Sequence, residues 1–502
     1  MKLGIATAAS VVGIEGHPVR IEAALLPGLP TFSIVGLADT AVSESRERIR
    51  AAFAASGIDF PNTRITVNLS PADIPKYGTA FDLGIACAIL AALAGHAGPP
   101  NSIVLGELGL DGSVRPVRGV LPACLGAIHR GLTGAVVPVE AVSEAELARS
   151  RVRGVWHLTQ VARAFGVRAN PVPPCEEIGA VGEPEPTAEP DLADVRGQAE
   201  ARLALEMAAA GEHHLFMVGP PGVGKSMLAV RLPGIMPLLT HSEGIEVAAV
   251  RSLLGSFDGR LPTRRPFADP HHTASAAALV GGGSSPRPGA ISRAHHGVLF
   301  LDELAEFAPA ALEALREPME TGRVHISRAR TAVVFPARFQ LVGAANPCRC
   351  GKLFDGGCTC SPASLRAYRG RLSGPLMDRF DLKVRLRRPS AAELTGPAGE
   401  PSSAVRARVE AARRRQAARF SEEAWDTNAH TPGEWLRSHT EVPAGMRRAI
   451  RRALTTGALS ARGVDKLLRA AWTVADLVGH SAPRSDDFDL AYTMRVMGVN
   501  ND

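Results

Sequence analysis

The chain has 502 residues, of which 45% are hydrophobic, with a net charge of +6 and seven cysteines. This length suits two or three domains, and the apolar content is ample for packed cores. No apolar run is long enough to span a membrane, no signal segment opens the chain, and an odd cysteine count argues against a disulfide framework, so we expect a cytoplasmic protein.

Residues 1–168 alternate short apolar runs with alanine-rich amphipathic stretches. This alternation predicts a compact α/β domain with its own core. The expected strands cover 4–9, 20–25, 31–35, 64–69, 103–108 and 135–138, and the expected helices cover 41–56, 80–95 and 121–130.

The following residues, 169–194, are rich in proline and acidic side chains and have almost no apolar periodicity, which predicts an exposed linker. Residues 195–389 read as an α/β domain with a parallel sheet. A break rich in Pro, Gly and Ser then leads into 390–502, where the pattern is helical and predicts a small all-α lid.

A complete phosphate-binding loop occupies 219–226, Gly219-Pro220-Pro221-Gly222-Val223-Gly224-Lys225-Ser226. It follows an apolar run and opens a helical stretch, which is the context the motif requires. The glycines let backbone N–H groups surround phosphates, Lys225 reaches the β and γ oxygens, and the Ser226 hydroxyl ligates Mg²⁺. The loop predicts binding of ATP with Mg²⁺.

A second motif, Gly297-Val298-Leu299-Phe300-Leu301-Asp302-Glu303, predicts a buried parallel strand that ends in two carboxylates. Asp302 would hold Mg²⁺ through water, and Glu303 would polarise the attacking water, which indicates hydrolysis rather than transfer. Two solvated acids at a strand end are the simpler interpretation of the motif alone. The phosphate loop upstream favours the catalytic interpretation.

Four cysteines, Cys348, Cys350, Cys358 and Cys360, form a C-x-C-x7-C-x-C pattern in a loop over 348–360. Four thiolates at this spacing can close a tetrahedral Zn²⁺ site. The one-residue gap within each pair is tighter than usual, and four reduced thiols without metal are the alternative.

Basic residues gather in three segments, which predicts a polyanionic partner such as a nucleic acid. The alternative is that these are ordinary soluble arginine-rich helices. The segments are 364–388 (Arg366, Arg369, Arg371, Arg379, Lys383, Arg385, Arg387, Arg388), 404–419 (Arg406, Arg408, Arg413, Arg414, Arg415, Arg419) and 446–469 (Arg447, Arg448, Arg451, Arg452, Arg462, Lys466, Arg469).

The two nucleotide motifs lie within a longer pattern that resembles the Mg-chelatase-like AAA+ proteins known as ComM or YifB, over essentially the full chain. The matching stretches are Pro270-His271-His272-Thr273, Ala278-Leu279-Val280-Gly281-Gly282-Gly283, Pro286-Arg287-Pro288-Gly289, Asn346-Pro347-Cys348 and Ser373-Gly374-Pro375-Leu376-Met377-Asp378-Arg379-Phe380-Asp381. The resemblance implies a homohexameric ATPase ring acting on DNA, such as a branch-migration helicase in natural transformation. A chelatase-type ATPase that remodels a protein partner is the alternative.

The resemblance also implies roles for single residues. Asn346 looks like the sensor that positions the lytic water, Arg379 like the arginine finger of a neighbouring subunit, and Arg462 like the second sensor, for which a plain surface arginine is the alternative. Two inserts, 270–293 and 322–335, would face the pore and grip a nucleic-acid backbone. Relatives usually have Arg-Ala before Pro-His-His; Ala268-Asp269 here implies a weaker contact with DNA.

Residues 1–168 look like the proteolytic domain of Lon-type proteases, notably at Pro75-Lys76-Tyr77-Gly78 and Gly106-Glu107-Leu108. That chemistry needs a serine activated by a lysine. Alignment of the motifs places Ala80 at the serine position and Leu121 at the lysine position. We therefore predict a Lon-like domain that is not a protease.

Overall fold

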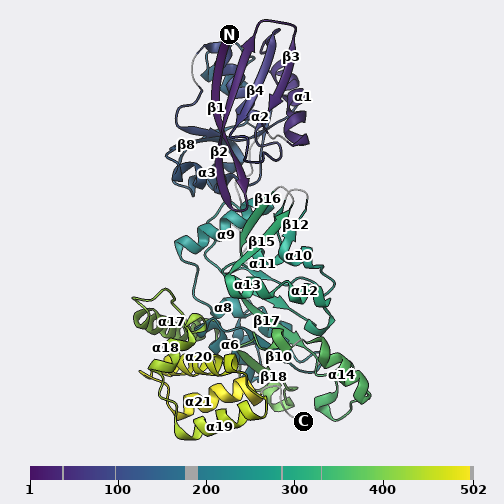
Figure 1. Ribbon diagram of the computed structural model, residues 1–502, viewed down its shortest axis with the longest axis vertical. Helices are drawn as coiled ribbons and strands as arrows, with labels where there is room; N and C mark the ends of the chain where they lie inside the picture. The colour runs from purple at the N-terminus through teal and green to yellow at the C-terminus, as the bar shows by residue number, and fades with distance from the viewer. Residues whose placement is uncertain are drawn as a thin grey trace.

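A computed structural model describes residues 1–36, 39–95, 98–175, 190–283, 286–328, 331–372 and 374–497, with the side chains of 328, 331 and 497 excepted. Most of the expected linker (176–189), Arg330 of the second insert, and Ser373 lie outside these ranges. Figure 1 shows the N-terminal strands at one end of an elongated molecule, a parallel sheet in the middle, and the C-terminal helices at the other end. No helix among the described residues is long and apolar enough to cross a bilayer.

The N-terminal sheet has the order β1-β2-β4-β3. Strands β1 (Lys2–Val12), β2 (Glu15–Leu26) and β4 (Arg64–Ser70) pair antiparallel, while β3 (Thr31–Val35) runs parallel to β4. The almost wholly buried α2 (Asp82–Ala94) crosses this sheet. Gly4 permits the contact, because a Cβ at that position would lie 2.0 Å from the Ala88 carbonyl oxygen.

A second, parallel sheet in this region consists of β5 (Ser102–Val104), β8 (Gly134–Pro138) and β9 (Arg151–Val155), next to the hairpin β6 (Glu107–Leu108) and β7 (Val114–Arg115). The single strand expected over 103–108 is thus two strands. The chain turns at Gly106, whose N–H bonds to the Ala80 carbonyl rather than to the sheet. The surrounding helices are α1 (Thr40–Ala55), α3 (Val120–His129), α4 (Val142–Glu146) and α5 (Leu158–Ala164).

The central sheet is parallel throughout, with the order β11-β14-β17-β10-β18. Strands β10 (Leu215–Val218) and β14 (Gly297–Leu301) are buried along their whole length, as expected for strands covered on both faces. The other strands are β11 (Phe267–Ala268), β17 (Phe339–Ala345) and β18 (Leu382–Arg385). Helices around the sheet include α6 (Ala199–Gly211), α7 (Lys225–Ala229), α8 (Leu232–Ile235), α9 (His241–Leu254), α12 (Pro309–Glu313) and α13 (Arg316–Thr321).

Both predicted inserts contain a hairpin. The first insert holds α10 (Ala276–Val280), the pair β12 (Gly281–Gly282) and β13 (Arg287–Pro288), and α11 (Ala290–Arg293). The second is the hairpin β15 (Arg323–Arg328) and β16 (Thr331–Pro336). In Figure 1 both hairpins lie on the side of the sheet that faces the N-terminal strands.

Helix α9 lies between the N-terminal region and the first insert of the central domain, and it packs on α3, α11 and β13 (Figure 1). Its Ala248 and Ala249 are buried in the N-terminal core, and the Ser252 hydroxyl donates to the carboxylate of Glu144. Burial raises the pKa of Glu144. The two regions therefore share apolar and polar contacts along one helix.

The C-terminal region is helical, as its pattern predicts. Helix α20 (Ala461–Val478) packs against α6 and α17 (Ser402–Arg419). Burial lowers the pKa of the nearby His213 to about 4. His213 shares a 2.7 Å hydrogen bond with the Thr473 hydroxyl of α20. The remaining helices are α14 (Pro362–Arg371), α15 (Gly374–Met377), α16 (Ala391–Thr395), α17 (Ser402–Arg419), α18 (Gly433–His439), α19 (Ala444–Thr455) and α21 (Ser485–Tyr492), followed by a π-helical turn over Thr493–Met497.

Candidate functional site

The predicted phosphate loop connects β10 to α7. Gly222 and Gly224 have φ angles of 72° and 98°, in the left-handed region that glycine adopts without steric cost. A Cβ at Gly219 would lie 2.9 Å from the Leu386 carbonyl oxygen, so this position also requires glycine. The motif glycines therefore allow the tight turn from strand to helix.

Lys225 lies inside this loop and is 8% exposed. Its Nζ donates to the carbonyls of Gly219 (2.8 Å) and Pro220 (3.0 Å) and to Oδ1 of Asn346 (3.0 Å). Burial lowers the Lys225 pKa, against the opposing effect of the nearby Asp302 and Glu303 carboxylates. The ammonium is thus held among oxygen atoms at the point where the motif would present it to phosphate.

The two acids follow β14, and their side chains lie differently. Asp302 accepts a 2.6 Å hydrogen bond from the Ser226 hydroxyl, so the two residues predicted to hold Mg²⁺ are adjacent. Glu303 is half-exposed and has a φ of 50°, which is uncommon for a residue with a side chain. Its Oε2 lies 3.0 Å from Nδ1 of His272, a contact that the sequence did not predict.

The order of the central sheet explains why these groups meet. β10, β17 and β14 are successive neighbours and run parallel, so the phosphate loop, Asn346 and the two acids all follow strands that end at the same edge. The edge combines backbone N–H groups, an ammonium, a hydroxyl beside a carboxylate, and a second carboxylate open to water. Such a set can bind a triphosphate with Mg²⁺ and orient a water molecule.

Arg379 and Arg462 lie at the opposite edge of the sheet. Arg379 precedes β18, whose first residue, Leu382, pairs with Leu215 at the start of β10. The four residues of β10 alone separate the two edges by roughly 13 Å. The structure therefore does not bring either arginine to the phosphate loop of its own chain.

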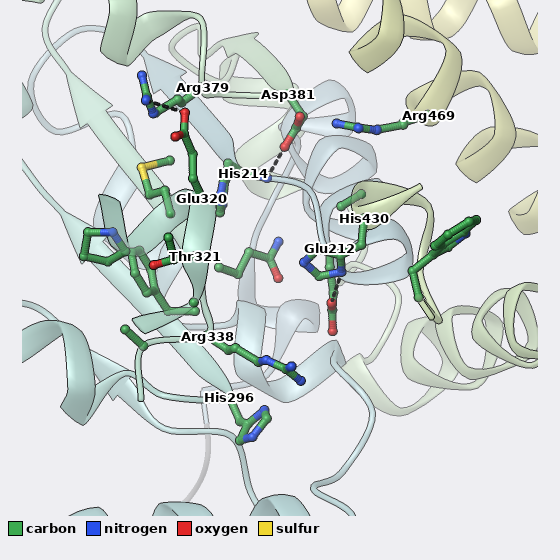
Figure 2. Close-up of a pocket in the computed structure, with 18 of the residues that line it drawn as sticks. Glu212, His214, His296, Glu320, Thr321, Arg338, Arg379, Asp381, His430 and Arg469 are labelled. Carbon is green, nitrogen blue, oxygen red and sulfur yellow. Dashed lines mark hydrogen bonds and ion pairs between the residues drawn. The ribbon is translucent and has the colours of Figure 1, made fainter. Parts of the chain in front are cut away.

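The carboxylate of Glu320 forms ion pairs with both Arg379 and Arg462. Glu320 Oε1 lies 2.6 Å from Nη2 of Arg379 and 3.9 Å from Nη1 of Arg462, whose side chain is 75% exposed. Figure 2 shows Arg379 directed at Glu320 on one wall of the pocket. A shared anionic partner thus brings the mostly buried Arg379 and the exposed Arg462 to one place.

This wall belongs to a cleft of about 670 Å³ at the amino ends of the strands. Its floor contains Asp381. Burial acts to raise the pKa of this carboxyl, but Lys466, 3.0 Å away, together with His213 and His214 outweighs burial and holds the pKa below its usual value. Sequence reasoning missed several titratable residues of the cleft, because they come from distant segments: Glu212, His214, Arg338 and His430 (Figure 2).

The four clustered cysteines converge as their spacing suggested. The Sγ atom of Cys348 lies 3.3 Å from that of Cys350 and 3.7 Å from that of Cys358, and Cys360 completes a group whose sulfur atoms all lie within 4.8 Å of one another. A tetrahedral zinc ion with Zn–S bonds of about 2.3 Å holds its sulfur atoms roughly 3.8 Å apart. The residues therefore fit Zn²⁺.

The cysteine loop also contacts the phosphate loop. Gly351 has a φ of 77°, and a Cβ there would lie 2.5 Å from Cδ of Pro221. On its other side, the Phe354 ring lies 3.6 Å below the guanidinium of Arg385. The cysteine loop is thus packed directly on the predicted nucleotide site.

The three basic segments differ in how many of their side chains form ion pairs or hydrogen bonds with the rest of the fold. On α17 most arginines bind the rest of the fold: Arg406 donates to the Gly234 carbonyl, Arg408 pairs with Glu206 and Glu400, Arg413 with Glu212, Arg415 with the Asp476 carbonyl, and Arg419 with the Asp476 carboxylate. The arginine content of this helix is therefore largely structural.

Helix α19 is different, because its basic side chains point outward. Met446, Ile450 and Ala453 are buried on one face. On the other face Arg447, Arg448, Arg451 and Arg452 are exposed and, within the described part of the chain, have no ion-pair partner. This is a compact cationic surface over two helical turns.

In the described part of residues 1–168, the positions aligned with the Lon dyad carry side chains that cannot perform its chemistry. Ala80 and Leu121 stand at the aligned positions. Nearby, the Thr79 hydroxyl donates to the Glu107 carboxylate, and the Lys76 ammonium is buried and donates to the Pro71 carbonyl. Both neighbouring polar groups are thus engaged in local contacts.

The chain is similar to known proteins over nearly its whole length. Three family profiles match: "Magnesium chelatase, subunit ChlI" over 191–394, "Subunit ChlI of Mg-chelatase" over 21–141, and "Magnesium chelatase, subunit ChlI C-terminal" over 399–495. The chain is 39% identical to the uncharacterized protein YifB of Escherichia coli over 95% of this chain and 94% of that protein. Competence protein ComM of Haemophilus influenzae is also 39% identical, over the same shares.

The chain belongs to the Mg-chelatase-like AAA+ family that includes YifB and ComM. An uncharacterized protein of Mycobacterium tuberculosis is 47% identical over 99% of this chain and all of that protein. Lon protease 2 of Herpetosiphon aurantiacus is 27% identical over 30% of this chain and a 20% share of its own length. Family membership implies an ATPase that uses ATP and Mg²⁺.

Proposed function

We propose that this family member is an ATP-hydrolysing ring motor that acts on DNA, a homohexameric branch-migration helicase. The observation that carries the proposal is the division of the catalytic groups between two opposite edges of one sheet. The competence protein ComM of Haemophilus influenzae, similar over most of the chain, supports a role in natural transformation.

The residues at the carboxyl edge take the chemical roles within one chain. Residues 219–226 bind the phosphates, with Lys225 on the β and γ oxygens and Mg²⁺ held by Ser226 and, through water, Asp302. Glu303 activates the attacking water, and Asn346, already bonded to Lys225, positions it. The contact between Ser226 and Asp302 supports the Mg²⁺ assignment.

The residues at the amino edge act on the next chain of the ring. Arg379 is the finger that neutralises charge on the transferred phosphoryl group, and Arg462, which shares Glu320 with it, is the second sensor. Because neither can reach the phosphate loop of its own chain, a complete site requires two copies. We assign the lid to 390–502, the ATPase domain to 195–389 and the Lon-like domain to 1–168, joined by the linker 169–194.

DNA is the substrate that the surface charge favours. The exposed arginines of α19 can attract the phosphates of a nucleic-acid backbone, and this attraction does not depend on base sequence. Arg287 and Arg293 of the first insert are exposed as well. A protein partner, as in the chelatase-type alternative, would need an acidic surface to match these cations. The alternative is therefore an outcome of the test below.

The test measures ATP hydrolysis with and without a four-way DNA junction, and particle mass with ATP present. We expect a hexamer and DNA-stimulated hydrolysis. Arg448→Gln/Arg451→Gln should weaken junction binding and lower its salt dependence by about one unit of slope per arginine. The matched double variant Arg149→Gln/Arg151→Gln, on exposed N-terminal arginines, should bind normally. Hydrolysis by a monomer, or hydrolysis indifferent to DNA, would contradict the proposal.

The Cys348, Cys350, Cys358 and Cys360 site is assigned to structural Zn²⁺ as part of the same proposal. We expect metal analysis of protein kept reduced and free of chelator to give about one zinc per chain. Cys350→Ser/Cys358→Ser should lose the metal and, because the loop rests on Pro221, bind ATP more weakly. The exposed Cys175 offers the control, Cys175→Ser, which should retain both. Absence of zinc in the wild type would exclude the site.

A further inference from the structure

The short segment that carries Arg379 is held by the C-terminal helices of the same chain. Residues 378–381 lie between α15 and β18, and two basic side chains from beyond residue 460 reach them. Lys466 of α20 and Arg495 of the last π-helical turn both end among the carbonyl and carboxylate oxygens of this segment. The backbone around Arg379 is thus attached to the C-terminal region by two cations.

Lys466 contacts both Arg379 and Asp381. Its Nζ donates to the carbonyl of Arg379 and lies 3.0 Å from Oδ1 of Asp381, and its side chain is only 13% exposed. The other carboxylate oxygen of Asp381 accepts the backbone N–H of His214 at 2.8 Å (Figure 2). The link through Lys466 is firm, because breaking it would leave a poorly hydrated ammonium and carboxylate without their partners.

Arg495 holds the residues on either side of Arg379. It is 4% exposed, donates to the carbonyl of Phe380, and lies 3.2 Å from the carboxylate of Asp378. The Ser460 hydroxyl, which caps α20, donates to the same carboxylate oxygen at 3.1 Å. Each residue from 378 to 381 therefore contacts the C-terminal region through a carbonyl or a carboxylate.

Helix α20 also carries the second candidate arginine. Arg462 and Lys466 are four residues apart on this helix, so their side chains leave the same face one turn apart. Lys466 binds the backbone of Arg379, while the side chains of Arg379 and Arg462 meet at Glu320. The separation of the two arginines is therefore set by one helical turn and one lysine contact.

We propose that Lys466 is a positioning residue that sets the distance between Arg379 and Arg462, so that both guanidinium groups meet one triphosphate on a neighbouring copy. Lys466 itself touches no reacting atom. Its ammonium acts through the carbonyl of Arg379 and the carboxylate of Asp381. This inference rests on the proposed roles of the two arginines and adds to that site the residue that holds them in register.

The test uses Lys466→Met, which nearly keeps the length of the side chain and removes the ammonium. Lys466→Met/Asp381→Asn also removes the carboxylate charge that the single variant leaves buried, which separates a loss of stability from a loss of position. Arg437→Met is the matched control, because Arg437 pairs at 2.7 Å with Asp465, the neighbour of Lys466 on α20. ATP hydrolysis, affinity for a fluorescent ATP analogue and particle mass are measured for each variant.

We expect Lys466→Met to lower kcat roughly ten- to hundred-fold, since a misplacement of about 1 Å in a catalytic group can cost up to about 10²-fold. The affinity for ATP should stay unchanged, because the phosphate loop lies at the opposite edge of the sheet. Lys466→Met/Asp381→Asn should show the same loss of kcat, and Arg437→Met none. An unaltered kcat, a parallel loss of ATP affinity, or full activity of the double variant would overturn the inference.

Mixed rings provide a measurement that a merely structural role would not change. Lys466→Met chains keep an intact phosphate loop, and Lys225→Ala chains keep well-placed arginines. The mixture should therefore recover part of the activity, at interfaces that join these two halves. No recovery, with ring formation confirmed by particle mass, would mean that Lys466 acts within its own chain and would contradict the proposal.

A double variant tests whether Lys466 acts through Arg379. Lys466→Met/Arg379→Ala should hydrolyse ATP no more slowly than Arg379→Ala, because no finger is left to position. A further fall in kcat would show that Lys466 has a separate role and would overturn the inference.

The variants of the two arginines separate this inference from the proposed function. If Arg379→Ala and Arg462→Ala both hydrolyse ATP normally, the shared site of the proposed ring fails and the inference fails with it. If both are inactive while Lys466→Met is fully active, the proposed ring stands and only the role of Lys466 is overturned.

Discussion

Replacing Arg379 with alanine should leave ATP binding near normal and lower ATP hydrolysis by about 10³–10⁵-fold, the range that arginine fingers contribute in other NTPases. In the proposed mechanism the guanidinium neutralises charge that develops on the γ-phosphoryl group, so its loss affects the transition state rather than the bound nucleotide. Arg379 lies at the amino edge of the sheet, away from the phosphate loop of its own chain. In the proposed ring, its effect therefore crosses a subunit boundary.

Mixing two inactive variants tests directly whether Arg379 acts on the nucleotide site of a neighbouring subunit. Arg379→Ala and Lys225→Ala chains, each inactive alone, should recover part of the activity when combined, because some interfaces then join an intact loop to an intact finger. Arg371→Ala is the control. Arg371 lies on the same basic segment as Arg379, but it forms an exposed ion pair with Glu306. No recovery on mixing, with ring formation confirmed by particle mass, would count against a shared site.

Replacing Glu303 with glutamine should retain ATP binding and lower turnover by about 10²–10⁴-fold, the usual contribution of a general base. The amide has nearly the same shape but cannot accept the proton of the attacking water. Lys225→Ala should instead abolish ATP binding, because the ammonium is the cation inside the loop.

Binding and single-turnover hydrolysis distinguish these two variants. Glu306→Gln is the matched carboxylate control: it lies three residues further on and faces Arg371 rather than the loop. Normal hydrolysis by Glu303→Gln would remove Glu303 from the proposed mechanism. Normal ATP binding by Lys225→Ala would exclude the phosphate loop from the proposed mechanism.

Local sequence predicted the elements that carry the nucleotide motifs. The apolar runs before 219 and through 297–301 are buried strands of a parallel sheet, because continuous apolar runs suit strands covered on both faces. The hairpin expected over 322–335 is present as β15 and β16. The single strand expected over 103–108 was wrong, because the turn at Gly106 depends on packing against Leu83 and Val114, which no local pattern reveals.

The sequence by itself determined which chemical groups this protein has: a phosphate loop, two acids after one strand, an asparagine after another, two candidate arginines and four clustered thiols. Spacing and residue type carry that information because each motif is local. Only the tertiary structure decided how the groups are divided. The order of five parallel strands places Arg379 and Arg462 at the edge opposite Lys225, brings His272 to Glu303, and leaves α19 rather than α17 with free charges. Those outcomes depend on contacts between segments far apart in the chain. The partner of a charged side chain is the opposite charge or carbonyl that folding brings next to it, and local sequence does not specify that neighbour.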